Sequence, residues 1–310
     1  MLDSLSKQFF KVLAASGTLK KFASSYGMRP NGFATRFIAG ESMDEAMAAA
    51  RIIEQTGLMT TLDLLGESVS SAAEAGQATE AYLGVIRAIA AAGVTRNISL
   101  KLTQMGLDID RATCVDNFRR ILDEATKLDF FVRIDMENSP YTDRTLDIFE
   151  TIWNSGYHNT GTVIQSCLKR SEADVRRLNT LGARVRLVKG AYKEPADVAY
   201  QLKSEVDAAY VKLVQLLLSE GTYPAFGTHD PAMLSEATAF AAAKGIDKSR
   251  YEFQMLYGIR RDLQTKYSSE GHRFRVYVPF GKEWFPYFMR RLGERPANVG
   301  FVLKGIVGER

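Results

Sequence analysis

The chain lacks most of the short motifs that would identify a familiar chemistry. It has two cysteines, Cys114 and Cys167, and three histidines, and none of them falls in a CxxC or HExxH pattern, so we expect no metal site and no disulfide framework. GxGxxG and GxxxxGK[ST] are also absent, which removes the usual dinucleotide fingerprint and the P-loop. A nucleotide cofactor would therefore have to be held by other loops.

Long apolar runs are missing as well. The N-terminus carries Asp3 and has no stretch suited to a signal peptide or a membrane span. Leu5, Phe9, Val12 and Leu13 fall at helical spacing, which predicts an amphipathic helix. We expect this helix to pack on the rest of the protein, with a membrane anchor as the less favoured alternative.

The charge of the chain is small. Its formal net charge is +4, and 46% of its 310 residues are hydrophobic, which is typical of a globular protein. The stretch 273–295 mixes basic and aromatic residues and resembles a nucleic-acid patch. Glu283 and Glu294 partly cancel that charge, so we expect no nucleic-acid partner.

From about residue 57 the chain alternates between short apolar runs and longer stretches with helical periodicity. The runs predict eight strands, at Leu58–Leu64, Asn97–Leu102, Phe130–Met136, Gly161–Cys167, Arg184–Val188, Ala225–Thr228, Tyr251–Gln254 and Arg273–Val278. The helical stretches are Ala81–Ala91, Val115–Lys127, Leu146–Trp153, Val198–Leu218 and Met233–Ala243. This rhythm favours an α/β (βα)₈ TIM barrel at residues 57–310, preceded by an N-terminal helical extension at residues 1–56. A doubly wound sheet is the alternative.

Polar residues stand where the predicted strands end, and in such barrels the chemistry lies at that face. Lys101 follows an apolar strand, and we expect it to face the barrel mouth rather than bulk solvent. Asp135 and Glu137 alternate along one strand and so should share a face, either to orient cations or to cap helices. His229 follows another strand and is suited to a ligand contact or to a structural role.

The pattern RRxxE near the C-terminus predicts an anion clamp. Arg290 and Arg291 precede Glu294 by four and three residues, so the carboxylate can hold both guanidinium groups on one helical face. Two fixed guanidinium groups bind a carboxylate or a phosphate. The alternative is a solvated surface ion pair of little energetic value.

Taken in order, these segments make the chain resemble bacterial monofunctional proline dehydrogenases. The resemblance is carried by Asp63–Glu67 (DLLGE), Ser99–Leu102 (SLKL), Arg133–Glu137 (RIDME), Gln165–Arg170, Arg186–Tyr192 (RLVKGAY), Gly227–Asp230, Tyr251–Leu256, Arg275–Gly281 and Tyr287–Asn298. It implies a distorted (βα)₈ barrel whose last helix covers the mouth. It also implies a flavoprotein, with FAD bound at the C-terminal face of the barrel.

The resemblance also implies roles for individual residues. The implied flavin contacts are Gln165, Arg186, Val188, Lys189, Gly190, Ala191, Tyr192, Thr228, His229 and Gln254. Lys101, Arg290 and Arg291 would bind the substrate carboxylate, while Leu256 and Tyr277 would pack against its ring. Asp135 and Glu294 would orient these cations, and Glu67 would pair with Arg290 as a gate.

The implied reaction is the first step of proline degradation to glutamate. L-proline would be oxidised to 1-pyrroline-5-carboxylate by hydride transfer from C5 to flavin N5, and a membrane quinone would take the electrons. The chain is too short for the aldehyde dehydrogenase half of bifunctional relatives, so the product would pass to a separate 1-pyrroline-5-carboxylate dehydrogenase. We expect a cytoplasmic protein with at most a peripheral contact at the inner face of the cell membrane.

Two other interpretations remain open from the sequence. One is a different flavin barrel, similar to methylenetetrahydrofolate reductase, which would need to recognise NAD(P)H or folate. The other is a basic barrel without catalysis that binds nucleic acid or a protein partner. Colour and its loss on adding proline would separate these classes.

Overall fold

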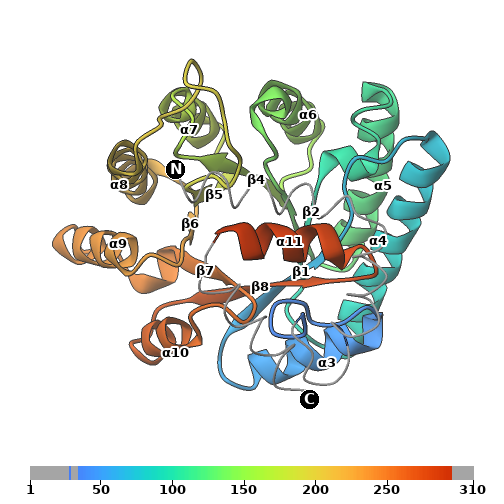
Figure 1. Ribbon diagram of the computed structural model, residues 1–310, viewed down its shortest axis with the longest axis horizontal. Helices are drawn as coiled ribbons and strands as arrows, with labels where there is room; N and C mark the ends of the chain where they lie inside the picture. The colour runs from blue at the N-terminus through green and yellow to red at the C-terminus, as the bar shows by residue number, and fades with distance from the viewer. Residues whose placement is uncertain (1–27, 29–33, 295–310) are drawn as a thin grey trace.

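The computed structural model describes residue 28 and residues 34–294, and within them eight parallel strands close into a barrel (Figure 1). The strands are β1 Met59–Leu64, β2 Asn97–Leu100, β3 Phe131–Ile134, β4 Thr160–Gln165, β5 Arg184–Val188, β6 Ala225–Gly227, β7 Glu252–Leu256 and β8 Phe274–Phe280. Each strand pairs with the next, and β1 pairs with β8 from Met59↔Arg275 to Leu64↔Phe280, which closes the ring. The predicted barrel is confirmed, and the doubly wound alternative is wrong.

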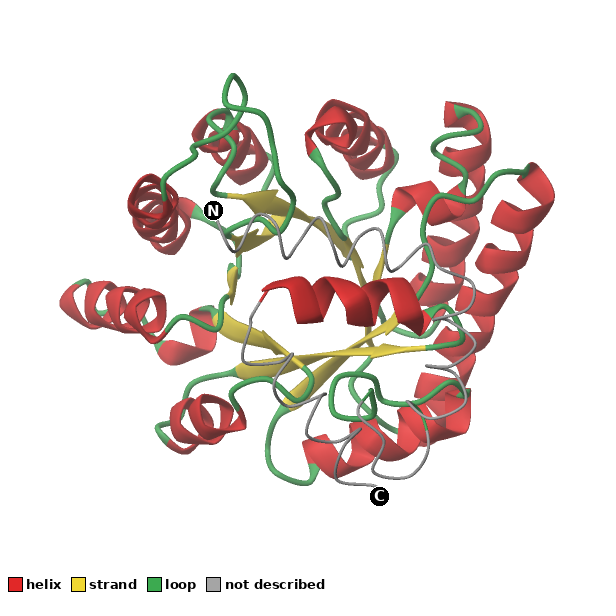
Figure 2. Ribbon diagram, viewed as in Figure 1, coloured by secondary structure: helices red, strands yellow, loops and turns green. Residues whose placement is uncertain are grey.

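Helices surround the barrel (Figure 2). They are α3 Met43–Glu54, α4 Ala72–Ala92, α5 Arg111–Lys127, α6 Thr142–Asn154, α7 Ser171–Thr180, α8 Lys203–Glu220, α9 Pro231–Ala243, α10 Arg261–Ser269 and α11 Trp284–Glu294, with short 3₁₀ turns η1 Leu102–Met105, η2 Ser139–Tyr141 and η3 Lys248–Arg250. The helix predicted from Val198 begins only at Lys203, because the backbone of Val198 and Ala199 closes turns onto Pro195. Of the helices in the described part of the chain, none combines the length and apolarity that a bilayer crossing requires.

The expected N-terminal extension falls mostly outside the described residues. Its described helix, α3, precedes β1 directly and packs against β1 and β8. A capping box at Ser42 and Glu45 starts this helix. The division of the chain at residue 56 stays a prediction.

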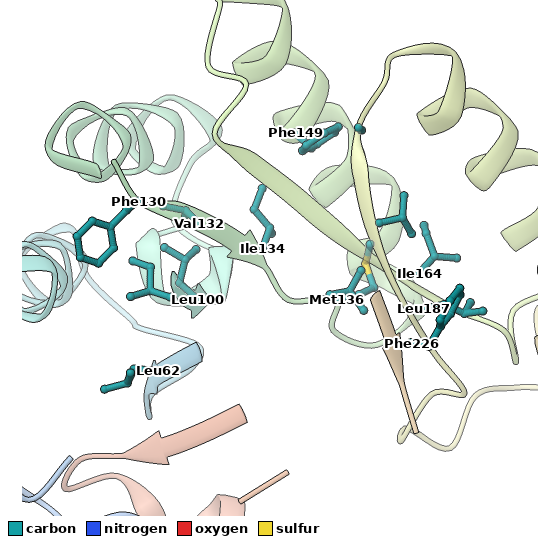
Figure 3. Packing of buried hydrophobic residues seen from close by; sticks show 14 of the residues in the cluster. Leu62, Leu100, Phe130, Val132, Ile134, Met136, Phe149, Ile164, Leu187 and Phe226 are labelled. Carbon is teal, nitrogen blue, oxygen red and sulfur yellow. The ribbon is translucent and has the colours of Figure 1, made fainter. Parts of the chain in front are cut away.

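The apolar core lies between the strands and the surrounding helices. Val132 and Ile134 of β3 and Leu100 of β2 are fully buried there, and Figure 3 shows them facing the helical layer. Each buried side chain of this kind stabilises the fold by about 1.5–3 kcal/mol. Since side chains alternate along a strand, the residues between these apolar positions point into the barrel.

The interior of the barrel is polar instead. Arg275 of β8 donates to Glu252 of β7 through Nε at 2.8 Å and Nη2 at 2.9 Å, and both side chains are at least nine-tenths buried. Arg133 of β3 donates to the backbone carbonyls of Thr162 and Arg184. The strands therefore bury both of their faces. The apolar face packs against the helices, and the charged face points into the barrel.

The last helix of the described residues, α11, lies across the mouth of the barrel (Figure 1). Trp284, Phe285 and Phe288 of α11 pack with Leu65, which follows β1, and with Ile259, which follows β7. These contacts fix α11 to the C-terminal end of the strands. The fold implied by the resemblance, with its last helix over the mouth, is confirmed in this respect.

The Glu252–Arg275 pair yields a prediction for stability. Burial alone would raise the pKa of Glu252, but Arg275 and hydrogen bonds from Arg275, Gln254 and Tyr223 lower it from 4.5 to about 2. The folded-state pKa is depressed, so the contribution of Glu252 is complete above about pH 4.5 and is lost as the pH falls toward 2. Glu252→Gln should lower the free energy of unfolding at pH 7 by about 3–5 kcal/mol, because Arg275 is left buried without its counter-charge.

Urea denaturation from pH 7 down to pH 3 measures this. Asp147→Asn is the matched control, since Asp147 pairs with Arg111 on the surface and should change the midpoint little. Equal midpoints for Glu252→Gln and the native sequence would contradict the prediction.

Candidate active site

Predicted site residues from six strands lie at the same end of the barrel. Because all strands are parallel, residues at their C-terminal ends meet at one mouth. Those residues are Lys101 after β2, Asp135 after β3, Gln165 at the end of β4, Val188 at the end of β5, Thr228 after β6 and Leu256 at the end of β7. The helix α11, which carries the predicted RRxxE clamp, covers this mouth.

Asp135 forms the centre of the mouth. It accepts a hydrogen bond from Arg186 Nη1 at 2.7 Å and one from Tyr277 Oη at 2.6 Å. Arg186 Nη2 also donates to Ser99 Oγ at 2.9 Å, and its guanidinium carbon lies 5.3 Å from the centre of the Tyr277 ring. Burial and Asp135 raise the pKa of Tyr277 well above its usual value, so the phenol remains a donor. One carboxylate therefore links β5 and β8 across the barrel.

Lys101 is buried at the mouth beside an acidic partner. Its Nζ lies 3.6 Å from Oδ2 of Asp63, and 8% of the residue is exposed. Burial on its own lowers the pKa of Lys101, but Asp63, Asp135 and Glu67 outweigh it and raise the pKa above its ordinary value. Lys101 is thus a permanent cation at neutral pH and cannot serve as a base. The expectation that it faces the mouth rather than solvent is supported.

Glu137 does not lie on a strand with Asp135. β3 ends at Ile134, so the expected alternation of the two carboxylates on one strand face is wrong. Glu137 Oε1 instead accepts from Thr103 Oγ1 at 2.9 Å, and Thr103 Oγ1 accepts from Ser68 N at 3.2 Å. Burial raises the pKa of Glu137 to about 7, against the opposing effects of Lys101 and Thr103.

The backbone carbonyl of Glu137 joins this chain to the next strand. It accepts from Nε2 of Gln165, a predicted flavin contact, at 2.8 Å. The hydrogen bonds therefore run from Ser68, next to the predicted gate residue Glu67, to the end of β4. They tie four neighbouring strand ends into one rim.

The loop after β5 contains the other predicted flavin contacts. Lys189 Nζ lies 2.5 Å from Asp207 Oδ1 and 2.7 Å from Asp230 Oδ2, so two carboxylates already neutralise its charge. The role of Lys189 as a flavin contact stays a prediction. Gly190 has a φ of +105°, and a Cβ there would lie 2.4 Å from Cys167 Sγ, so only glycine fits. Ala191 is exposed and Tyr192 is half-buried.

The remaining predicted contacts lie after β6 and on β7. Thr228 is buried, and its Oγ1 accepts from Asp230 N at 3.1 Å. His229 Nε2 accepts from Leu256 N at 3.0 Å, which ties β6 to β7 and gives this histidine a structural bond. Gln254 donates through Nε2 to Glu252, while its Oε1 is buried with no hydrogen-bond partner among the described residues.

The predicted clamp on α11 is described only in part. The guanidinium of Arg291 lies over the ring of Tyr287, 5.1 Å from its centre. The side chains of Arg290 and Glu294 lie outside what the structure describes, so the clamp and the gate stay predictions. A cavity of about 320 Å³ lies beside α11, and Glu67, Lys101, Glu283 and Tyr287 are among the residues that line it.

Three residues of the mouth were not recognised as site residues in the sequence. Ser99 and Asp63 are fully buried at the ends of β2 and β1, and Tyr82 of α4 donates to Leu64 O at 3.1 Å and Ser99 O at 3.2 Å. Thr61 and Asp63 lie two residues apart, as do Ser99 and Lys101, and polar residues at this spacing indicate a polar strand face that points into the barrel. That spacing could have identified Asp63 and Ser99 as site residues, but no local sequence pattern indicates that Tyr82 reaches the mouth.

Comparison with known proteins identifies the family. A family model described as proline dehydrogenase matches residues 46–304. The chain belongs to the proline dehydrogenase family. It is 42% identical to proline dehydrogenase 1 of Bacillus subtilis, over 97% of this chain and 99% of that relative. It is also 39% identical to the proline dehydrogenase of Deinococcus radiodurans, over 99% of both chains.

Solved structures agree on the fold. Proline utilization A from Bdellovibrio bacteriovorus superposes with a TM-score of 0.78 at 28% identity, covering 84% of this chain. The corresponding protein of Bradyrhizobium japonicum superposes with a TM-score of 0.71 at 25% identity, covering 87%. The chain spans 32% of each of those longer chains. The family is flavin-dependent, and this chain is an enzyme with proline dehydrogenase activity.

The Asp135 network yields a prediction for activity. Asp135→Asn removes the charge that both Arg186 and Tyr277 contact. Hydrogen bonds to charged groups contribute about 1.5–3 kcal/mol each, so proline-dependent dye reduction should fall about ten- to a hundredfold. Asp143→Asn is the matched control, because Asp143 is 82% exposed and pairs with Arg170 at the surface. Equal rates for Asp135→Asn and this control would show that the network does not serve the reaction.

Proposed function

We propose that this enzyme oxidises L-proline to 1-pyrroline-5-carboxylate with FAD as its bound cofactor. The observation that carries the proposal is the cation at the mouth, Lys101, buried beneath α11 and next to a cavity. A buried ammonium suits a small substrate with a carboxylate, because the anion compensates the charge away from water. Proline dehydrogenase membership supports the choice of amino acid.

The carboxylate of proline would be held from two sides. Lys101 approaches from β2, and Arg290 and Arg291 belong to α11, which lies across the mouth. Since Lys101 stays protonated, its role is to bind and orient, not to take the proton of the amine. Leu256 of β7 and the ring of Tyr277 of β8 would pack against the apolar part of the substrate. Fixing a small ring at these points removes much of the entropic cost of the reaction.

The residues present fit a flavin. Arg186 Nε is a buried donor and Gln254 Oε1 a buried acceptor, and neither has a hydrogen-bond partner among the described residues. The edge of an isoalloxazine ring offers acceptors and one N–H donor, which would satisfy both atoms. Gly190 leaves the strand end open to a close approach of the cofactor. No dinucleotide fingerprint is needed, because the contacts come from strand ends.

When bound, FAD would supply the hydride acceptor, flavin N5, for oxidation at C5 of proline. The protein orients the reacting ring through the carboxylate and excludes water from the mouth with α11. Arg186, held by Asp135 and Ser99, would keep a fixed positive charge at the flavin. Glu67, which lines the cavity with Lys101, would act as the gate partner of Arg290.

The electron acceptor and the fate of the product belong to the proposal as well. We infer that a membrane quinone reoxidises the flavin and that contact with the membrane is peripheral. The product would pass to a 1-pyrroline-5-carboxylate dehydrogenase. A relative in Escherichia coli is named as a bifunctional protein; it is 29% identical over 96% of this chain, which spans 26% of that relative.

The direct test is optical. The purified protein should be yellow, with a flavin spectrum that bleaches under anaerobic conditions when L-proline is added. Cyclopentanecarboxylate is the control, since it has the ring and the acid but no amine, and it should leave the flavin oxidised. A colourless preparation, or bleaching by NAD(P)H but not by proline, would refute the proposal.

The clamp makes a separate prediction. Arg290→Ala and Arg291→Ala should each raise KM for proline about tenfold or more, because a guanidinium–carboxylate contact is lost, while the flavin stays bound. Steady-state kinetics and the flavin-to-protein absorbance ratio measure both effects. Arg261→Ala, on the exposed face of α10, is the control. Loss of flavin in the α11 variants would mean that these arginines hold the cofactor instead.

A further inference from the structure

Asp63 is a fully buried carboxylate with an incomplete set of partners. It is the fifth residue of β1, points into the barrel and has no exposed surface. Its Oδ1 lies 3.5 Å from Tyr82 Oη, at the limit of a hydrogen bond. Its Oδ2 has no hydrogen-bond donor among the described residues and lies 3.6 Å from Lys101 Nζ.

We propose that Asp63 is a positioning residue that aims Lys101 at the substrate carboxylate and keeps it charged, an inference that rests on the proposed function. A carboxylate with a purely structural role would be fully hydrogen-bonded at this depth, since buried polar atoms rarely remain unsatisfied. Asp63 instead faces a buried cation that is the first residue beyond β2. The strands that carry the two residues are neighbours, with Asp63 in register with Ser99.

The separation of 3.6 Å is what makes this arrangement useful. It is close enough for strong Coulomb attraction in a buried site and longer than an ordinary N–H···O bond. Asp63 thus orients the ammonium group of Lys101 without accepting a hydrogen bond from it. Those donors remain for a substrate carboxylate arriving from the cavity that Lys101 lines.

Several groups from other elements also face Lys101. Asp135 after β3, Glu67 in the loop after β1 and Tyr192 in the loop after β5 favour its charged form, while burial disfavours it. Glu137 also lies within electrostatic reach of Lys101. Asp63 is the largest of the favourable contributions. Its removal therefore shifts the balance toward the neutral amine more than removal of any other neighbour.

Tyr82 supports Asp63 from the helical layer. This fully buried side chain of α4 places its hydroxyl between Leu64 O and Ser99 O, which spans the ends of β1 and β2. Its contact with Asp63 limits how far the carboxylate can turn away from Lys101. Removal of the Tyr82 hydroxyl is therefore a second and milder way to disturb the pair formed by Asp63 and Lys101.

The test compares the flavin-loaded native protein with Asp63→Asn. Cyclopentanecarboxylate, detected by its perturbation of the oxidised flavin spectrum, should bind the native protein with an unchanged Kd from pH 8 to 9.5, above the pKa of about 7 that burial gives Glu137. In Asp63→Asn, Kd should rise at high pH, by about tenfold for each pH unit above the lowered pKa of Lys101. KM for proline should rise about tenfold at pH 9 with a much smaller change in kcat, because only binding of the carboxylate is affected.

Tyr82→Phe should shift the profile in the same direction but by less, and it carries the test if Asp63→Asn loses flavin or fails to fold. Asp143→Asn should match the native profile at every pH. Flat and superimposable profiles in both Asp63→Asn and Tyr82→Phe would overturn the proposal. Failure of the native protein to reduce its flavin with proline would instead reject the proposed function, so the two failures are distinguishable.

Discussion

The mouth of this barrel depends on one half-buried carboxylate. Asp135 accepts from Arg186 on β5 and from Tyr277 on β8, and Arg186 in turn reaches Ser99 on β2. A guanidinium buried this deeply would be costly without a counter-charge, and Asp135 provides it at hydrogen-bond distance. The partners of Asp135 therefore hold their positions before any ligand arrives.

Carboxylates compensate buried cations at other levels along the barrel axis as well. Glu252 compensates Arg275 deeper in the barrel, and Asp63 faces Lys101 at the mouth. The apolar core lies outside the strands, under the helices, and leaves the interior to these pairs. A charged interior is costly to assemble, yet it gives cations with fixed positions near the cavity at the mouth. Recognition of a small anion needs such preorganised charge more than it needs surface area.

Much of the fold follows from local sequence patterns. The eight strands were predicted within about two residues of their observed ends, because each is a short apolar run between turns. α7 and α10 were not predicted. Ser171–Thr180 buries only Val175 and Leu178 among its apolar residues, and Arg261–Ser269 is similarly polar, so neither shows a strong helical stripe. Tertiary packing, not local pattern, decides such helices.

The site was predictable where residues follow a strand and less so elsewhere. Lys101 and Asp135 stand at strand ends, and their meeting follows from the parallel barrel. The pairing of Lys189 with Asp207 and Asp230 joins β5 to α8 and α9, and no local pattern in the sequence links those positions. Tyr82 likewise reaches the mouth from α4 through tertiary packing alone. Contacts between elements distant in sequence are what a single sequence leaves open.

The central claim is that a buried cation at the mouth, Lys101, holds a small ring by its acid group. A crystal structure of the oxidised flavoprotein with cyclopentanecarboxylate tests this most directly. The account predicts a carboxylate within hydrogen-bond distance of Lys101 Nζ, with the ring against Tyr277. A carboxylate bound away from Lys101, with that side chain still turned only toward Asp63, would contradict it.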